Sequence, residues 1–581
     1  MSDSQIEQAK KALEEAQRAL AEAEAKAAEA ANAEEAADAP VDEPAAAPAE
    51  PAAGGPLSEP SVSVIRDGYK SEASSLDIGA LVNGEARADV QVRIPLRMLN
   101  RHGLVAGATG TGKTKTLQVL AEQLSDAGVP VFAPDIKGDL TGVLTAGESG
   151  EKLLARTEGI GQAWEGKAFP SELFSLGGRG TGVPIRATVT DFGPLLLSKV
   201  LGLNQTQESS LSLVFAFADQ QGLPLVDLKD LREVLLYLTG DEGKEELGRI
   251  GGVSKATVGV ILRELTAFAA DGAEVFFGEP EFEIDDLLQV TDGRGVISLL
   301  QIPEVASQPR LFSTFLMWLL GELFELLPEV GDPDKPKLVF FFDEAHLLFN
   351  DASKDFLAAI TQTVRLIRSK GVGVFFVTQT PKDVPGDVLA QLGSRIQHQL
   401  RAHTPDSAKA LRQTVRTYPN SDYDLEEVLT QLGIGEAIVT VMNEKGAPTP
   451  VAWTRVRAPQ GSMDPSPQAT QDAVVQASSL DAKYRDAVDR ESAFEMLQAR
   501  IGAAEAAAEA EAFAKEEEER REAELKEAAR LEREAARDAK AKSSSRSKRD
   551  NGNPVLDALT SRTGQRIIKQ VFRGILGNRR R

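Results

Sequence analysis

One eight-residue stretch has the residue types and spacing needed to bind a phosphate group. It fits the Walker A pattern G-x-x-x-x-G-K-[ST] at each constrained position, and its residues are Gly107, Ala108, Thr109, Gly110, Thr111, Gly112, Lys113 and Thr114. In such a loop the glycines let the backbone curl around a phosphate, the lysine adds positive charge at the β- and γ-phosphates, and the last hydroxyl is a ligand for Mg²⁺. The stretch predicts a nucleotide site with a catalytic Lys113 and a metal ligand at Thr114.

Two carboxylates follow an apolar run at residues 338–342, which predicts a buried strand. Asp343 at the tip of this strand would hold Mg²⁺, and Glu344 would polarise the attacking water. An acidic pair favours hydrolysis of the nucleotide over its use as a binding switch.

A third polar position follows the apolar run 372–377. If this strand lies beside the strand of the phosphate loop, residues 103–106, then Gln379 comes close to the γ-phosphate. An amide there can sense the γ-phosphate or position water, so Gln379 is a candidate catalytic residue.

Four stretches together resemble the HerA/FtsK group of P-loop ATPases, and most closely its HerA-like bacterial members. They are residues 102–114, 133–139, 342–346 and 365–381, and the resemblance spans about residues 95–455. It implies a sheet of the ASCE type, with one strand between the phosphate-loop strand and the strand of the catalytic glutamate. It also implies a homo-oligomeric ring, often a hexamer, with ATP at the subunit interfaces.

The resemblance assigns roles to three further residues. One of Arg365 and Arg368 would be an arginine finger inserted into a neighbour's site, and Asp135 would lie near the metal or the nucleotide. HerA proteins carry an N-terminal β-barrel, whereas only residues 61–100 are available for one here.

The order of apolar runs predicts an α/β fold with a mainly parallel sheet, a P-loop NTPase of the RecA-like class. The runs expected to be buried parallel strands are 103–106, 129–133, 296–300, 338–342, 372–377 and 437–441. Helical patterns at 207–217, 228–238 and 258–268 indicate a mostly helical insertion over about 145–290. The alternative is a missed strand in this insertion, for which residues 184–189 are the best candidate.

The composition of the chain divides it into four parts. Residues 1–60 are rich in Ala, Glu and Pro and are expected to be disordered, and residues 61–457 form the ATPase core. Residues 458–541 are expected to be a linker and a long charged helix, which is a candidate coiled coil. The basic tail 542–581 contains an amphipathic helix at 561–576.

The overall composition narrows the classes of function. Cysteine is absent, which excludes disulfide partners and thiolate-ligated metals, and neither a signal peptide nor an apolar span is found, so a cytoplasmic location is expected. The net charge of −23 argues against a surface devoted as a whole to nucleic acid, but it leaves room for a local basic channel.

These observations predict an enzyme that binds ATP and Mg²⁺ and hydrolyses ATP. The first interpretation is a DNA translocase of the helicase type, with Lys409, Arg412 and Arg416 as candidate DNA contacts. The second is an ATPase scaffold that remodels proteins or works at a membrane surface, where the helix at 561–576 contacts anionic lipid or an acidic protein. The third is an ATP-dependent switch without DNA activity, which Glu344 disfavours.

Overall fold

The computed structural model describes residues 55–249, 251–302, 309–349 and 354–544. The first 54 residues of the expected acidic segment and the expected basic helix at 561–576 lie outside these ranges. The described chain begins just before helix α2 (Glu59–Gly68), whose N-terminus is capped by the hydroxyl of Ser58. The folded core therefore starts slightly before residue 61.

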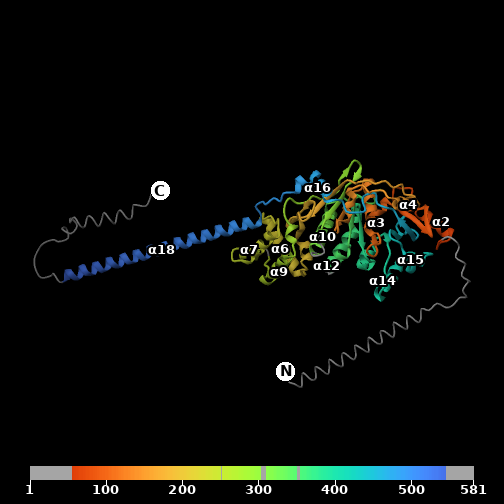
Figure 1. The fold of residues 1–581 in the computed structure, drawn as a ribbon. Helices are drawn as coiled ribbons and strands as arrows, with labels where there is room; N and C mark the ends of the chain where they lie inside the picture. Colours follow the sequence, from red (N-terminus) through yellow and green to blue (C-terminus); the bar gives the residue numbers. More distant parts are fainter. Residues whose placement is uncertain (1–54, 250, 303–308, 350–353, 545–581) are drawn as a thin grey trace, which may run out of the picture.

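A single large sheet forms the centre of the described molecule (Figure 1). From edge to edge its twelve described strands are β2 (Glu85–Pro95), β1 (Ser75–Asn83), β14 (Ala452–Val456), β13 (Glu436–Thr440), β12 (Ser394–Gln397), β3 (Gly103–Ala106), β11 (Val372–Thr378), β10 (Leu338–Phe342), β4 (Val131–Asp135), β9 (Ile297–Gln301), β5 (Ser171–Leu176) and β6 (Val183–Ile185). A separate two-stranded ribbon pairs β7 (Val290–Thr291) with β8 (Arg294–Gly295).

The strands from β12 to β6 are all parallel, which confirms a mainly parallel sheet. The remaining four strands pair antiparallel. The expectation of a parallel strand at 437–441 is therefore wrong in its direction, because β13 pairs antiparallel with β12 and β14. An apolar run shows that both faces are covered, but it carries no information on strand direction.

The carboxyl ends of the parallel strands share one edge of the sheet, which we call the carboxyl edge. The side chains of each strand alternate between two cores. Phe340 and Phe342 of β10 belong to the core that contains the apolar residues of α10 and α12, whereas Val339 and Phe341 belong to the core that contains those of α3.

Helices cover both faces of the sheet (Figure 1). In chain order, the other described α-helices are α3 (Lys113–Asp126), α4 (Glu151–Gly159), α5 (Val189–Val200), α6 (Gln205–Gln220), α7 (Leu228–Thr239), α8 (Lys244–Arg249), α9 (Lys255–Ala270), α10 (Pro309–Leu326), α11 (His346–Phe349), α12 (Lys354–Ile367), α13 (Gly386–Leu389), α14 (Pro405–Val415), α15 (Leu425–Gln431), α16 (Gln468–Ala477), α17 (Asp481–Tyr484) and α18 (Ala493–Ser544).

The segment 145–290 differs from a simple helical insertion. It holds helices α4 to α9, but β5 and β6 within it extend the main sheet beyond β9. The strand β6 overlaps the candidate at 184–189, and β5 was not anticipated. Its sequence mixes polar and apolar residues because its first two positions are only half-buried, so it lacks the apolar run of a central strand.

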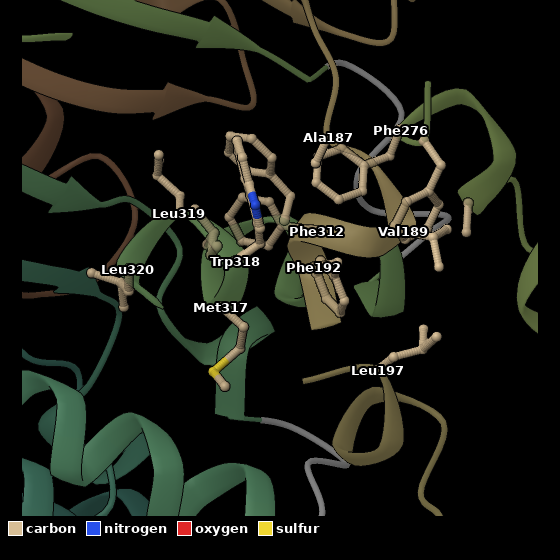
Figure 2. Close-up of a cluster of buried hydrophobic side chains, with 14 of the residues drawn as sticks. Ala187, Val189, Phe192, Leu197, Phe276, Phe312, Met317, Trp318, Leu319 and Leu320 are labelled. Atoms are coloured by element: carbon tan, nitrogen blue, oxygen red, sulfur yellow. The ribbon is translucent and has the colours of Figure 1, made fainter. Parts of the chain in front are cut away.

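The helical part of this segment packs on the main sheet through aromatic side chains. Figure 2 shows three aromatic side chains gathered in one cluster: Phe192 of α5, Trp318 of α10, and Phe276 from the segment after α9. The ring centroids of Phe276 and Trp318 are 5.4 Å apart, and those of Phe192 and Phe276 are 6.2 Å apart. The helices are therefore joined to the central sheet by a continuous apolar interior.

The segment expected to be a linker, which begins at residue 458, is instead packed on the core. The backbone N–H groups of Gln460 and Gly461 donate to the carboxylate of Glu122 on α3, at 2.7 and 2.9 Å. Further on, Arg186 donates to the carbonyl of Tyr484 at 2.9 Å. A polar, proline-containing sequence resembles a linker because its contacts are made mainly by its backbone.

The long charged helix begins at Ala493, within the expected range 458–541. Its first turns pack on α7, with Leu497 fully buried. Beyond that contact α18 extends away from the body of the molecule (Figure 1), and its described side chains are almost all exposed. No helix in the described ranges combines the length and apolar character of a membrane span.

Candidate nucleotide site

The phosphate loop connects β3 to α3 at the carboxyl edge, as predicted. Three of its glycines have positive φ. Gly107 is required because there is no space for a side chain, and Gly110 is required because of its backbone conformation. At Gly107 a Cβ atom would lie 2.5 Å from the Cβ of His398, so the loop can rest on the next strand only without a side chain. Gly110 has a φ of 82°, and an added Cβ would meet open space, so its requirement is conformational.

Lys113 begins helix α3 and turns back into the loop. Its Nζ donates to the carbonyl oxygens of Gly107 at 2.6 Å and Ala108 at 3.2 Å. Burial lowers the pKa of Lys113, while Glu344 and Asp343 oppose that shift. A cation thus lies inside the loop, where the phosphates of a nucleotide would lie, and the half-buried Thr114 follows it in the first helical turn.

The acidic pair follows β10 at the same edge. Both side chains are buried, with Asp343 9% and Glu344 8% exposed. The backbone N–H of Glu344 donates to Oδ1 of Asp343 at 3.0 Å. Glu344 has a φ of 49°, a left-handed conformation that is unusual for a residue with a side chain and that is concentrated at functional sites.

The two carboxylates differ in their electrostatics. Burial raises the pKa of Asp343 to about 6, and the neighbouring charge of Glu344 adds to the rise. Burial would also raise the pKa of Glu344, but the hydrogen bond and charge of Lys137, together with His346 and Lys113, lower it below the ordinary value. Glu344 is therefore held as the anion, the form needed in a general base.

Lys137 is a further residue of this site, and its role is not evident from its position in the sequence. Its Nζ lies 2.5 Å from Oε1 of Glu344, and it reaches there from the loop after β4, the strand beside β10. The Nδ1 of His346 lies 3.3 Å from the other carboxylate oxygen of Glu344, without hydrogen-bond geometry. Lys137 belongs to the motif 133–139, so a signal was present in the sequence. Its pairing with Glu344 depends on the adjacency of β4 and β10, which the sequence does not show.

Asp135 lies at the end of β4 and is 2% exposed. Its Oδ2 accepts hydrogen bonds from the backbone N–H of Leu140 at 3.2 Å and from the amide of Gln301 at 3.3 Å. Burial raises the pKa of Asp135 to about 6. These contacts hold the turn that carries Lys137, and a role of Asp135 near the metal or the nucleotide stays a prediction.

Gln379 follows β11, the strand between β3 and β10. The backbone N–H of Gly107 donates to the carbonyl of Thr378 at 3.2 Å, which joins the start of the phosphate loop to the end of β11. Gln379 is exposed at this edge, between the loop and the acidic pair. The expected position of Gln379 depends on β11 lying beside β3, and the two strands are adjacent in the sheet.

Arg365 and Arg368 lie apart from these residues. Both precede the first residue of β11, at the amino end of the parallel strands, whereas the phosphate loop follows the carboxyl end of β3. Arg368 contacts Asp332 at 3.4 Å, and Asp332 also pairs with Arg101, which precedes β3, at 3.2 Å. The two arginines are therefore not brought to the nucleotide site of their own chain.

The residues present fit a nucleotide with Mg²⁺. No cluster of three or more His, Cys, Asp or Glu that could hold a metal alone is found in the ranges that the structure describes. Mg²⁺ in nucleotide sites commonly uses one or two protein oxygens, with phosphates and water as its other ligands. The hydroxyl of Thr114 and the carboxylate of Asp343 provide such oxygens, and the second carboxylate oxygen of Glu344 is buried without a hydrogen bond.

A phosphate loop between β3 and α3, with an acidic pair two strands away across β11, defines a P-loop NTPase of the ASCE type. Residues 81–581 match the family model described as helicase HerA-like C-terminal, and the chain belongs to this family. The match confirms the resemblance found in the sequence.

Individual relatives are distant. The DNA double-strand break repair helicase HerA of Saccharolobus solfataricus is 23% identical over 378 residues, which cover 64% of this chain and 66% of that protein. A probable helicase of Methanocaldococcus jannaschii is 25% identical over 377 residues, covering 63% of this chain and 68% of that protein. Among solved structures, the plasmid coupling protein TrwB in complex with a non-hydrolysable ATP analogue covers 73% of this chain and 98% of its own, with 16% identity and a TM-score of 0.49.

Proposed function

We propose that the protein hydrolyses ATP with Mg²⁺ and that this hydrolysis drives a motor acting on DNA. The observation that carries the first part is the convergence of three neighbouring strand ends. Lys113 follows β3, Gln379 follows β11, and Asp343 and Glu344 follow β10, so a phosphate-binding cation and a buried carboxylate base share one edge of the sheet.

Each residue has a defined task in this mechanism. Lys113 exchanges the carbonyls of Gly107 and Ala108 for phosphate oxygens, because the loop that now surrounds its ammonium is the phosphate cradle. Thr114 and Asp343 would hold Mg²⁺, which when bound neutralises charge on the phosphate oxygens. Glu344 accepts a proton from the water that attacks the γ-phosphate, Gln379 positions that water, and the products are ADP and phosphate.

The second part of the proposal concerns the substrate. The relatives are named as helicases, and each of the three HerA proteins among them is less than 25% identical to this chain. DNA is therefore inferred for this chain only as a proposal. Helix α14 offers a surface for it. Lys409, Arg412 and Arg416 are exposed and spaced by three and four residues, which places them on one side of this helix.

The proposal includes a ring of identical subunits in which Arg365 or Arg368 completes the site of the next subunit. What supports it is the position of both arginines at the edge of the sheet opposite their own phosphate loop. An arginine supplied in trans can accelerate phosphoryl transfer by several orders of magnitude, so the ring would couple neighbouring sites.

Steady-state ATP hydrolysis by the full chain, with and without double-stranded DNA, tests the proposal. We expect hydrolysis that DNA stimulates, no hydrolysis by Lys113→Ala, and a loss of stimulation when Lys409, Arg412 and Arg416 are all replaced by Gln. Glu344→Gln should still bind ATP, with turnover lower by roughly 100-fold or more. Hydrolysis indifferent to DNA would overturn the motor on DNA, and unchanged turnover in Glu344→Gln would overturn the assigned base.

A further inference from the structure

Ile434 is the most exposed large apolar side chain in the described residues, with 79% of its surface exposed. It lies in the short loop before β13, between Gly433 and Gly435, and its neighbours in the chain are buried, Leu432 at 2% and Ala437 at 0% exposed. An isolated exposed apolar residue needs no explanation, but this one lies on the rim of the nucleotide site.

The loop of Ile434 is fixed to the phosphate loop. The backbone N–H of Gly435 donates to the carbonyl of Thr111 at 3.0 Å. Arg156 of α4 donates to the carbonyl of Gly435 at 2.9 Å. The approach is close, since a Cβ atom on Gly112 would lie 3.2 Å from the Cα of Gly435. Ile434 therefore projects into solvent from a loop held by hydrogen bonds.

The buried carboxylate of Glu436 also holds this loop in place. The carboxylate of Glu436, 8% exposed, accepts hydrogen bonds from the backbone N–H of Gly433 at 3.1 Å and from the indole of Trp453 at 2.9 Å. Arg455 adds an ion pair with the same carboxylate at 3.1 Å. The exposure of Ile434 is thus a property of a built loop and not of a frayed end.

The direction of a bound nucleotide follows from the chemistry of phosphoryl transfer. The attacking water and the leaving oxygen lie roughly in line on opposite sides of the γ-phosphorus. Because Glu344 activates the water at the end of β10, the leaving ADP must extend to the other side of the phosphate loop. In the sheet order β10, β11, β3, β12, β13 that other side is formed by the loops after β12 and before β13.

We propose that the loop of residues 432–435 is the subsite for the nucleotide base and that Ile434 contacts the face of a purine ring. The proposal rests on the proposed function, because it concerns the same ATP site. An apolar side chain covers a ring face without reading its hydrogen-bonding edge, so this contact favours a purine nucleoside without distinguishing adenine from guanine.

Inorganic tripolyphosphate provides a test, since it has the phosphates of ATP and lacks the base. The affinities of the full chain for Mg²⁺-ATP and Mg²⁺-tripolyphosphate are measured by calorimetry for the wild type, for Ile434→Ser and for the control Val64→Ser. Val64 on α2 is also β-branched and is 60% exposed. Ile434→Ser should weaken ATP binding roughly 5- to 20-fold, as expected for uncovering about half of an isoleucine side chain.

Binding of tripolyphosphate should change less than twofold in Ile434→Ser, and Val64→Ser should affect neither ligand. Equal weakening of both ligands would overturn the subsite, because the loop would then only support the phosphate loop. Unchanged ATP affinity would overturn it as well and would leave Ile434 to a subunit contact. A wild-type protein that binds neither ligand would refute the proposed function itself, whereas one that binds both equally would refute only the base subsite.

Discussion

At the residue scale, each charged side chain of the candidate nucleotide site has a partner within the protein. Lys113 is solvated by the carbonyls of its own loop, and Glu344 is paired with Lys137. Each of these charges is thus paired with a group of the protein itself. One carboxylate oxygen of Glu344, the proposed base, is therefore engaged by Lys137.

Substitution of Lys137 tests whether this ion pair restrains the base. Lys137→Met should raise the basal turnover of ATP severalfold, because the free carboxylate of Glu344 is a stronger base and both of its oxygens can accept a proton. The KM for ATP should change by less than about threefold. Lys137→Arg keeps the pair and serves as the matched control. A turnover that falls in Lys137→Met would show that this cation helps catalysis instead.

His102 gives the fold a dependence on pH. Its ring is 2% exposed, its Nδ1 accepts the backbone N–H of Val374 at 3.1 Å, and burial lowers the pKa of His102 to about 4. Below the ordinary histidine pKa of about 6.5 the unfolded chain binds a proton that the folded chain does not, so stability that is present at neutral pH is lost as the pH falls toward 4.

Urea unfolding at pH 7 and pH 5 measures this effect. From the two pKa values, His102 should account for a loss of about 2 kcal/mol in the free energy of unfolding between pH 7 and pH 5. His102→Asn should reduce the loss by that amount, because it removes the buried titrating ring. His403→Asn is the control, because the ring of His403 is exposed. An equal pH dependence in the wild type and His102→Asn would contradict the assignment.

At the scale of elements, α18 combines a docked beginning with an exposed remainder. The carboxylate of Asp230, which also completes the N-terminal capping box of α7, accepts hydrogen bonds from Ser492 at 2.5 Å and from the backbone N–H of Phe494 at 2.9 Å. Leu497 is fully buried. Further along, ion pairs such as Glu522 with Lys526, four residues apart at 3.2 Å, support a helix that has few tertiary contacts.

Substitutions of two leucines distinguish the docked part of α18 from its exposed part. Leu497→Ala should lower the free energy of unfolding by about 2–4 kcal/mol, because it leaves a cavity against α7. Leu525 is 70% exposed, so Leu525→Ala should change it by less than about 0.5 kcal/mol. Urea unfolding of the full chain measures both. A large effect of Leu525→Ala would show that this part of α18 is buried against another copy, as a coiled coil requires.

At the scale of the whole molecule, the sheet separates two sets of candidate catalytic residues. The phosphate loop and the acidic pair lie at its carboxyl edge, while Arg365 and Arg368 lie toward the other edge. Arg368 already pairs with Asp332, whereas Arg365 is exposed in the last turn of α12. A ring would bring one subunit's arginines to the next subunit's nucleotide, and Arg365 is the better placed of the two.

Mixing inactive subunits tests the arrangement in trans. The Lys113→Ala protein has an inactive nucleotide site but keeps both arginines. The double variant with Arg365→Ala and Arg368→Ala keeps the nucleotide site but lacks both arginines. Each protein alone should be nearly inactive, but an equal mixture should regain activity at about a quarter of its interfaces, where an intact site meets an intact arginine. Steady-state ATP hydrolysis measures the recovery. A mixture as inactive as its parts would argue that the arginines do not act in a neighbour's site.

The central strands and the phosphate loop could be predicted from the sequence because their determinants are local. Continuous apolar runs mark strands buried on both faces, as at β10, and the glycine and lysine positions of a phosphate loop are set by the chain's own curvature around a ligand. The long helix was also visible in composition, since alternating charges without proline favour a helix whatever surrounds it.

Other features were decided only by the tertiary structure. The strand β5 and the packing of the segment after residue 458 depend on partners far away in the chain, through backbone contacts that leave no periodic pattern. The pairing of Lys137 with Glu344 joins residues 207 positions apart. Sequence spacing determines which groups follow which strand, but the order of strands in the sheet determines which of those groups meet.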